Sequence, residues 1–108
     1  DMSEQAIEQF MRAGATAILC ASDVIASFVI NRLLRNGVQV PQQVSVVGYD
    51  DLPVSSYLGI TTVAQSRMDL GKIAFTVLND LLSGVSINKL TLRPKLIVRS
   101  STAAVAQD

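Results

Sequence analysis

The chain alternates between two hydrophobic patterns along its length. In one of them, apolar residues recur every three or four positions, a spacing typical of helices that pack on a core. This pattern predicts helices at residues 3–13, 24–36 and 68–83. Each is followed by a glycine, the residue that most often ends a helix: Gly14, Gly37 and Gly84.

Short apolar runs rich in β-branched residues make up the second pattern. They predict strands at residues 16–20, 44–48, 61–65, 90–92 and 96–99. We expect a loop from Leu52 to Ile60, because this segment contains a proline and a glycine. The alternation of helix and strand predicts a single α/β unit, residues 1–108, with a mostly parallel sheet flanked by helices. Such units normally open with a strand, so an opening helix indicates a fragment.

Two of the expected helices present large apolar surfaces, and the helix at 24–36 is apolar over more of its circumference than one sheet can cover. In the helix at 24–36, only Ser27, Asn31 and Arg35 form a narrow polar stripe. The flank that carries Phe28 therefore needs a further cover, from this chain or from another subunit. The helix at 68–83 ends on a cluster of large apolar residues, Leu78, Leu81 and Leu82. We predict a homodimer with Phe28 or this leucine cluster in the contact.

Charge and composition exclude several classes of protein. The chain has nine basic and nine acidic side chains and a formal net charge of zero, and 49% of its residues are hydrophobic. Binding to DNA needs clustered Lys and Arg, so we expect no direct DNA contact from this chain. No apolar run approaches the roughly 20 residues of a membrane span. The first residues show no secretion signal, so we expect a cytoplasmic protein without a membrane contact.

The sequence is poor in catalytic groups. There is no histidine, and the single cysteine, Cys20, lies inside an apolar strand, where a small core residue is expected. No glycine-rich phosphate loop occurs, and we expect no cofactor. An oxygen-ligated metal site or a phosphoryl-accepting site on Asp50, Asp51 and Asp23 is a less favoured alternative.

Polar residues follow two of the expected strands. Ser22 and Asp23 come after the first strand, and Asp50 and Asp51 come after the second. In parallel sheets, the carboxyl ends of the strands open onto one edge, where ligands bind. The alternatives are a helix cap for Asp23 and a solvated turn for the two later aspartates.

Several segments together resemble the lactose-repressor/galactose-repressor family of bacterial transcription regulators. The resemblance runs in order through nearly the whole chain and includes Val40-Pro41-Gln42-Gln43-Val44 followed by Ser45-Val46-Val47-Gly48-Tyr49-Asp50-Asp51. The other matching pieces are Ala21-Ser22-Asp23, Arg35-Asn36-Gly37, Thr61-Thr62-Val63-Ala64-Gln65, Leu70-Gly71 and residues 96–102.

The resemblance implies a periplasmic-binding-protein-like effector domain with a ligand cleft between two α/β lobes. This chain corresponds mostly to the C-terminal lobe, without the DNA-binding headpiece and most of the N-terminal lobe. Residues 66–90 would pack on that missing lobe. Asp50 would contact the effector, a sugar or a purine, together with Ser22 and the neighbouring Asp23. Gln65 matches the crossover between lobes, and the loop around Tyr57 would join the dimer contact.

The resemblance has departures that bear on the effector. Ser22 stands where the family usually has asparagine, and Phe28 stands where it usually has glycine. The favoured function is the effector-binding and dimerising part of a transcription repressor, with a carbohydrate as the expected effector. The alternative is the solute-binding protein of a transport system, and a metal- or phosphoryl-dependent enzyme is a third reading.

Overall fold

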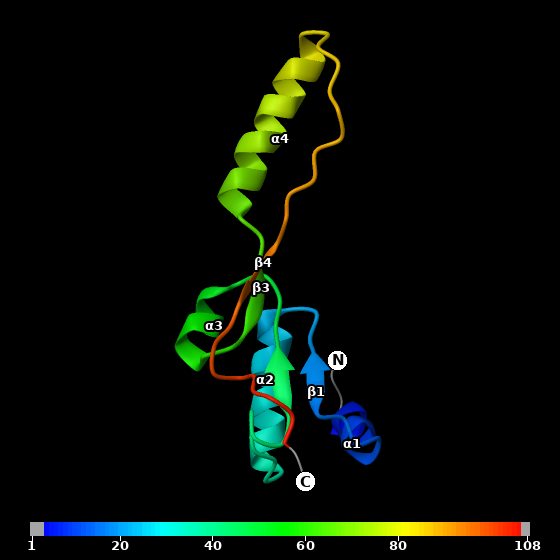
Figure 1. The fold of residues 1–108 in the computed structure, drawn as a ribbon, viewed down its shortest axis with the longest axis vertical. Coiled ribbons are helices and arrows are strands. Elements are labelled where there is room, and N and C mark those ends of the chain that lie inside the picture. Colours follow the sequence, from blue (N-terminus) through cyan, green and yellow to red (C-terminus); the bar gives the residue numbers. More distant parts are fainter. Residues whose placement is uncertain (1–3, 107–108) are drawn as a thin grey trace. The chain divides into compact units, whose positions relative to one another are not determined.

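The chain divides into two compact units in the computed structural model, which describes residues 4–106. Residues 1–64 and 96–108 form the first unit, and residues 65–95 form the second. The chain therefore leaves the first unit once, after the third strand, and returns to it once (Figure 1).

Parallel strands lie at the centre of the first unit, as the sequence predicts. Strand β1 (Ala17–Leu19) pairs in parallel with β2 (Ser45–Val47), and Ile18 lies opposite Val46. On its other side, β2 makes a parallel bridge from Val47 to Thr61, the residue before β3 (Thr62–Ala64). A second small sheet joins β3 to β4 (Lys95–Ile97).

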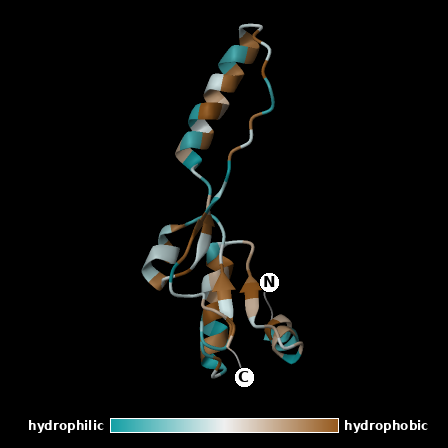
Figure 2. Cartoon of the chain, viewed as in Figure 1, coloured by the Kyte–Doolittle hydropathy of each residue, from teal (hydrophilic) through white to brown (hydrophobic). Residues whose placement is uncertain are grey.

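Helix α2 (Asp23–Arg35) supplies much of the core. Ala26, Val29 and Leu33 lie on one face of this helix and are fully buried. They belong to a single cluster with residues of α1 (Glu4–Arg12) and the strands: Ile7, Ile18, Cys20, Val44, Val46 and Ile60. Burying a side chain of this size contributes roughly 1.5–3 kcal/mol. In Figure 2, β1 and β2 are mostly brown. Of their residues, Ile18, Ser45 and Val46 are buried.

Two expectations from the sequence are wrong. The segment from Leu52 to Ile60 is not a loop but contains a short helix, α3 (Pro53–Leu58). Pro53 suits the first turn of a helix, and Gly59 ends α3 in the left-handed conformation with φ 67°. Residues 90–92 form no strand, since no neighbouring strand among the described residues bonds to them, and only β4 forms in that region.

The second unit consists of one helix and an extended return segment. Helix α4 (Arg67–Leu82) begins at Ser66, whose Oγ accepts a hydrogen bond of 3.2 Å from the Asp69 N–H. No residue of α4 is buried, although both hydrophobic and hydrophilic bands run along it (Figure 2). Among the described residues, none of the helices has the length and apolar character needed to cross a membrane.

Candidate functional site

The carboxyl ends of β1 and β2 meet at one edge of the first unit. The parallel pairing of these strands fixes this arrangement, and the Asp23 N–H donates a hydrogen bond of 3.0 Å to the Tyr49 carbonyl. The structure therefore brings the Ser22–Asp23 and Asp50–Asp51 pairs together, as the sequence predicts. The four residues nevertheless differ in what their side chains do.

Asp23 is fully buried, and this chain occupies both of its carboxylate oxygens. Oδ2 accepts a hydrogen bond of 2.6 Å from the Leu52 N–H, and Oδ1 accepts one of 2.6 Å from the Thr62 hydroxyl. Gly48 also lies against this carboxylate, so closely that a Cβ at that position would collide with Asp23 Oδ1. A buried carboxylate needs such hydrogen bonds to replace water. Asp23 therefore links three parts of the unit: the start of α2, the segment after β2 that carries Leu52, and β3.

Ser22 caps α2. Its backbone is extended, and its Oγ accepts a hydrogen bond of 3.2 Å from the Ile25 N–H. This is the geometry of an N-cap residue, so the cap function that the sequence left open for Asp23 belongs to Ser22. The half-buried hydroxyl of Ser22 can still donate one hydrogen bond.

Asp50 and Asp51 form a strained turn. Both have positive φ angles, 101° for Asp50 and 53° for Asp51, a region that residues other than glycine seldom adopt. Strain of this kind costs of order 1–3 kcal/mol per residue and concentrates at functional sites. The Asp50 N–H donates a hydrogen bond of 2.9 Å to Val63 O, while the Asp50 side chain is exposed and makes no hydrogen bond within the described residues.

Arg99 holds the other aspartate of the turn. Its Nη2 donates to Asp51 Oδ1 at 2.9 Å, and its Nη1 donates to the Ile60 carbonyl at 3.1 Å. From its sequence position, Arg99 is expected only at the end of the last strand. The sequence does contain a signal for this contact. Arg99 is a basic residue directly after an apolar run, and an acidic turn follows another strand of the same chain.

The C-terminal segment that follows Arg99 packs beside β2. The Ser101 carbonyl accepts a hydrogen bond of 2.9 Å from the Val46 N–H. The Ser101 hydroxyl donates to Val46 O at 2.5 Å and accepts from the Thr61 N–H at 2.8 Å. These bonds fix residues 99–101 beside the sheet, so that the Arg99 side chain reaches the turn after β2.

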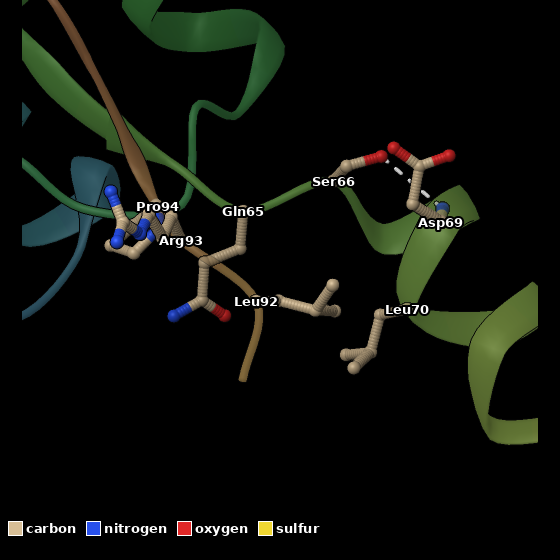
Figure 3. A pocket seen from close by; sticks show the side chains of 7 residues that line it. All are labelled: Gln65, Ser66, Asp69, Leu70, Leu92, Arg93 and Pro94. Carbon is tan, nitrogen blue, oxygen red and sulfur yellow. Dashed lines mark hydrogen bonds between the residues drawn. The ribbon is translucent and has the colours of Figure 1, made fainter. Parts of the chain in front are cut away.

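Gln65 lies in the second unit, in a pocket of about 200 Å³. As Figure 3 shows, its side chain extends towards the return segment that carries Leu92 and Arg93. The complete lining is Gln65, Ser66, Asp69, Leu70, Leu92, Arg93 and Pro94. The pocket offers an amide, a carboxylate and a guanidinium, but all its lining residues are exposed.

The side chains predicted for the dimer contact are exposed on three helices. Phe28 on α2 is 64% exposed and Tyr57 on α3 is 86% exposed. On α4, the leucine cluster is equally open to solvent, with exposed fractions of 55% for Leu78, 57% for Leu81 and 78% for Leu82. The uncovered flank of α2 that the sequence predicts is therefore present.

The remaining reactive groups are the Cys20 thiol and the acidic side chains. Cys20 is buried, and desolvation raises the pKa of its thiol to about 11, which keeps it protonated at neutral pH. Within the described residues, no group of three or more Cys, Asp or Glu side chains could hold a metal ion.

The comparisons with known proteins agree with this architecture. Residues 1–102 match the family model of the periplasmic binding protein-like domain. The HTH-type transcriptional repressor PurR of Haemophilus influenzae is 33% identical over 97 residues, which are 83% of this chain and 29% of the repressor. The chain thus spans less than a third of the length of this relative.

Two solved structures show the same fold. The lac repressor dimer bound to operator has a TM-score of 0.82 at 31% identity, covering 93% of this chain and 37% of the repressor. A LacI family regulator from Arthrobacter sp. FB24, in complex with lactose, has a TM-score of 0.78 at 30% identity, with coverages of 92% and 40%. The α/β fold expected from the sequence is confirmed, and the chain belongs to the periplasmic binding protein-like domain family.

Proposed function

We propose that this chain is the effector-binding and dimerising part of a bacterial transcription repressor, with a carbohydrate as effector. The observation that carries the proposal is the contrast between three neighbouring aspartates. Asp23 and Asp51 are bonded within the chain, whereas Asp50 is exposed on a strained turn at the strand-end edge. A carboxylate held in this way can accept hydrogen bonds from the hydroxyl groups of a sugar.

The other candidate residues add complementary groups. Ser22 lies at the same edge and can donate one hydrogen bond. Gln65 remains a candidate on its own, in the pocket of the second unit, where its amide offers both donor and acceptor atoms. Asp23 has a different part in this proposal: its carboxylate is fully buried and bonded within the chain, so it holds the edge in shape and does not meet the effector.

The relatives favour a regulator over the alternative solute-binding protein of a transport system. PurR is named a transcriptional repressor, and the lac repressor structure contains operator DNA. The Arthrobacter regulator holds lactose, which supports a carbohydrate as the effector class. With zero net charge, this chain would reach DNA only through a separate headpiece.

The exposed apolar surfaces fit two kinds of partner. Residues 66–90 would pack on an N-terminal lobe, which would cover the apolar side chains that α4 exposes. The flank of α2 with Phe28, together with Tyr57 on α3, would face a second copy of the chain. Uncovered apolar patches of this size commonly mark interfaces.

Calorimetry on the full-length parent tests the effector site, with lactose and ribose as probes. Asp50→Asn should weaken binding of the sugar about 5- to 150-fold, which corresponds to roughly 1–3 kcal/mol for a poorly paired buried group. Glu8→Gln is the matched control, because Glu8 is an exposed acid on α1, away from the strand-end edge. Unchanged affinity in a folded Asp50→Asn protein would refute the assignment of Asp50.

A further inference from the structure

The turn that carries Asp50 is bonded on two sides. Along β3, the Asp50 N–H donates to Val63 O at 2.9 Å, and the Asp51 N–H donates to the Thr62 hydroxyl at 3.3 Å. On the other side, Asp51 Oδ1 accepts the bond from Arg99 at 2.9 Å. The turn is thus fixed through its backbone by one segment and through a side chain by another.

Such support is needed because both residues of the turn have positive φ angles. Aspartate tolerates the left-handed region better than most residues, but two in succession persist only where the surroundings enforce them. The hydrogen bonds to β3 secure the two N–H groups. The ion pair with Arg99 is what holds the Asp51 side chain.

Arg99 is suited to this task by its fork of donors. One guanidinium nitrogen binds Asp51 and another binds the Ile60 carbonyl, so its direction is fixed at two points. The side chains of Arg99 and Asp51 are only 22% and 30% exposed, so water screens this ion pair less than a surface pair. A lysine would offer a single point charge and could not match both acceptors.

We propose that Arg99 is a positioning residue for effector binding. Through Asp51, it holds the turn in its left-handed conformation, so that the Asp50 carboxylate is presented in one orientation before the effector arrives. The proposal rests on the proposed function of Asp50 as the effector contact. A group fixed in advance binds more tightly because less freedom is lost on binding.

The contacts that hold the turn lie close, along the chain, to the two ends of the segment of residues 65–95. The chain leaves for the unit of residues 65–95 just after Val63, and it returns just before Arg99. Both connecting segments therefore hold the turn that presents Asp50.

Hydrogen–deuterium exchange, resolved by residue in the full-length parent without ligand, tests the positioning role. In Arg99→Gln, the amides of Asp50 and Asp51 should exchange at least tenfold faster. The amide of Val46, bonded to Ser101 O, should stay within twofold of the parent. Arg99→Lys should give an intermediate rate at the turn, and Arg35→Gln, an exposed arginine at the end of α2, should change neither.

A merely structural role predicts a different pattern, in which Arg99→Gln accelerates exchange equally at Val46 and at the turn. That result, or unchanged exchange at Asp50 and Asp51, would overturn the proposal. Because this measurement needs no effector, it stands even where the assignment of Asp50 as a sugar ligand fails.

A binding cycle with lactose as the probe then tests the link to function. Arg99→Gln should weaken lactose binding at least fivefold when Asp50 is present, and should cause no further loss in an Asp50→Asn background. Equal losses in both backgrounds would overturn the positioning role while leaving Asp50 as an effector contact. If Asp50→Asn alone leaves lactose binding unchanged, the proposed function of Asp50 is refuted. The expected effect of Arg99 on lactose binding is then refuted with it.

Discussion

The carboxylate of Asp23 and the hydroxyl of Thr62 form a buried hydrogen bond of 2.6 Å between residues 39 positions apart. Both side chains are fully buried, and no cation within the described residues pairs with Asp23. The carboxylate is stabilised instead by donors from the Thr62 hydroxyl and the Leu52 backbone. The bond links α2 to β3 beneath the candidate effector site.

Thr62→Val tests the strength of this link, because valine keeps the shape of threonine but donates no hydrogen bond. The buried carboxylate would lose one of its two hydrogen-bond donors and keep only the Leu52 N–H, so the free energy of unfolding should fall by about 1–3 kcal/mol. Urea unfolding measures this change. Thr76→Val is the control: its hydroxyl bonds to Lys72 O on an exposed face of α4, and its loss should change stability by less than about 0.5 kcal/mol. Equal effects of the two substitutions would contradict the prediction.

Ser55 offers the opposite case, a buried hydroxyl whose Oγ has no hydrogen-bond partner among the described residues. Removing an unsatisfied polar group relieves its desolvation penalty. Ser55→Ala should therefore leave the free energy of unfolding unchanged or raise it by up to about 1 kcal/mol. In contrast, Ser101→Ala removes a hydroxyl that bonds to Val46 O and the Thr61 N–H, and should lower stability by about 1–3 kcal/mol. A large loss in Ser55→Ala would show that its hydroxyl has a partner.

Cys20 should make stability depend on alkaline pH. Its pKa is raised from 9.0 to about 11 by burial, so below pH 9 the thiol is neutral in the folded and unfolded states alike. Between pH 9 and about 11, only the unfolded state releases the proton, and stability falls by at most about 1.4 kcal/mol per pH unit. The difference between the parent and Cys20→Ala isolates this effect. At pH 8, a thiol reagent should label the native protein far more slowly than the urea-unfolded protein.

The sequence allowed the central sheet and the strand-end edge to be predicted because their signals are local. Apolar runs bounded by turn residues mark β1 and β2, and parallel pairing then places the residues after them together. The helix at 68–83 was also found from its period alone, and α4 differs from it by one residue at each end.

Other features depend on partners that are distant in the sequence. Nothing in the sequence near Asp23 shows that its carboxylate accepts hydrogen bonds from Thr62 and Leu52. The role of Arg99 depends on Asp51, 48 positions away. The short helix α3 is hard to predict for a different reason: Pro53 and Gly59 are typical of loops, but they also suit a helix start and end.

The chain should associate with a second copy through its exposed apolar side chains. Large apolar side chains are exposed on α2 and α4, among them Phe28 and Leu78, and burying one of this kind is worth roughly 1.5–3 kcal/mol. We therefore expect a homodimer at micromolar concentration, measured by light scattering after size exclusion. Phe28→Asp should give a monomer if α2 holds the contact, and Leu78→Asp should do so if α4 holds it. Asn31→Asp and Asn79→Asp add the same charge at exposed polar positions of the two helices and should leave the dimer intact. A monodisperse monomer in the unmodified chain would contradict the prediction, because the exposed faces would then need no second copy.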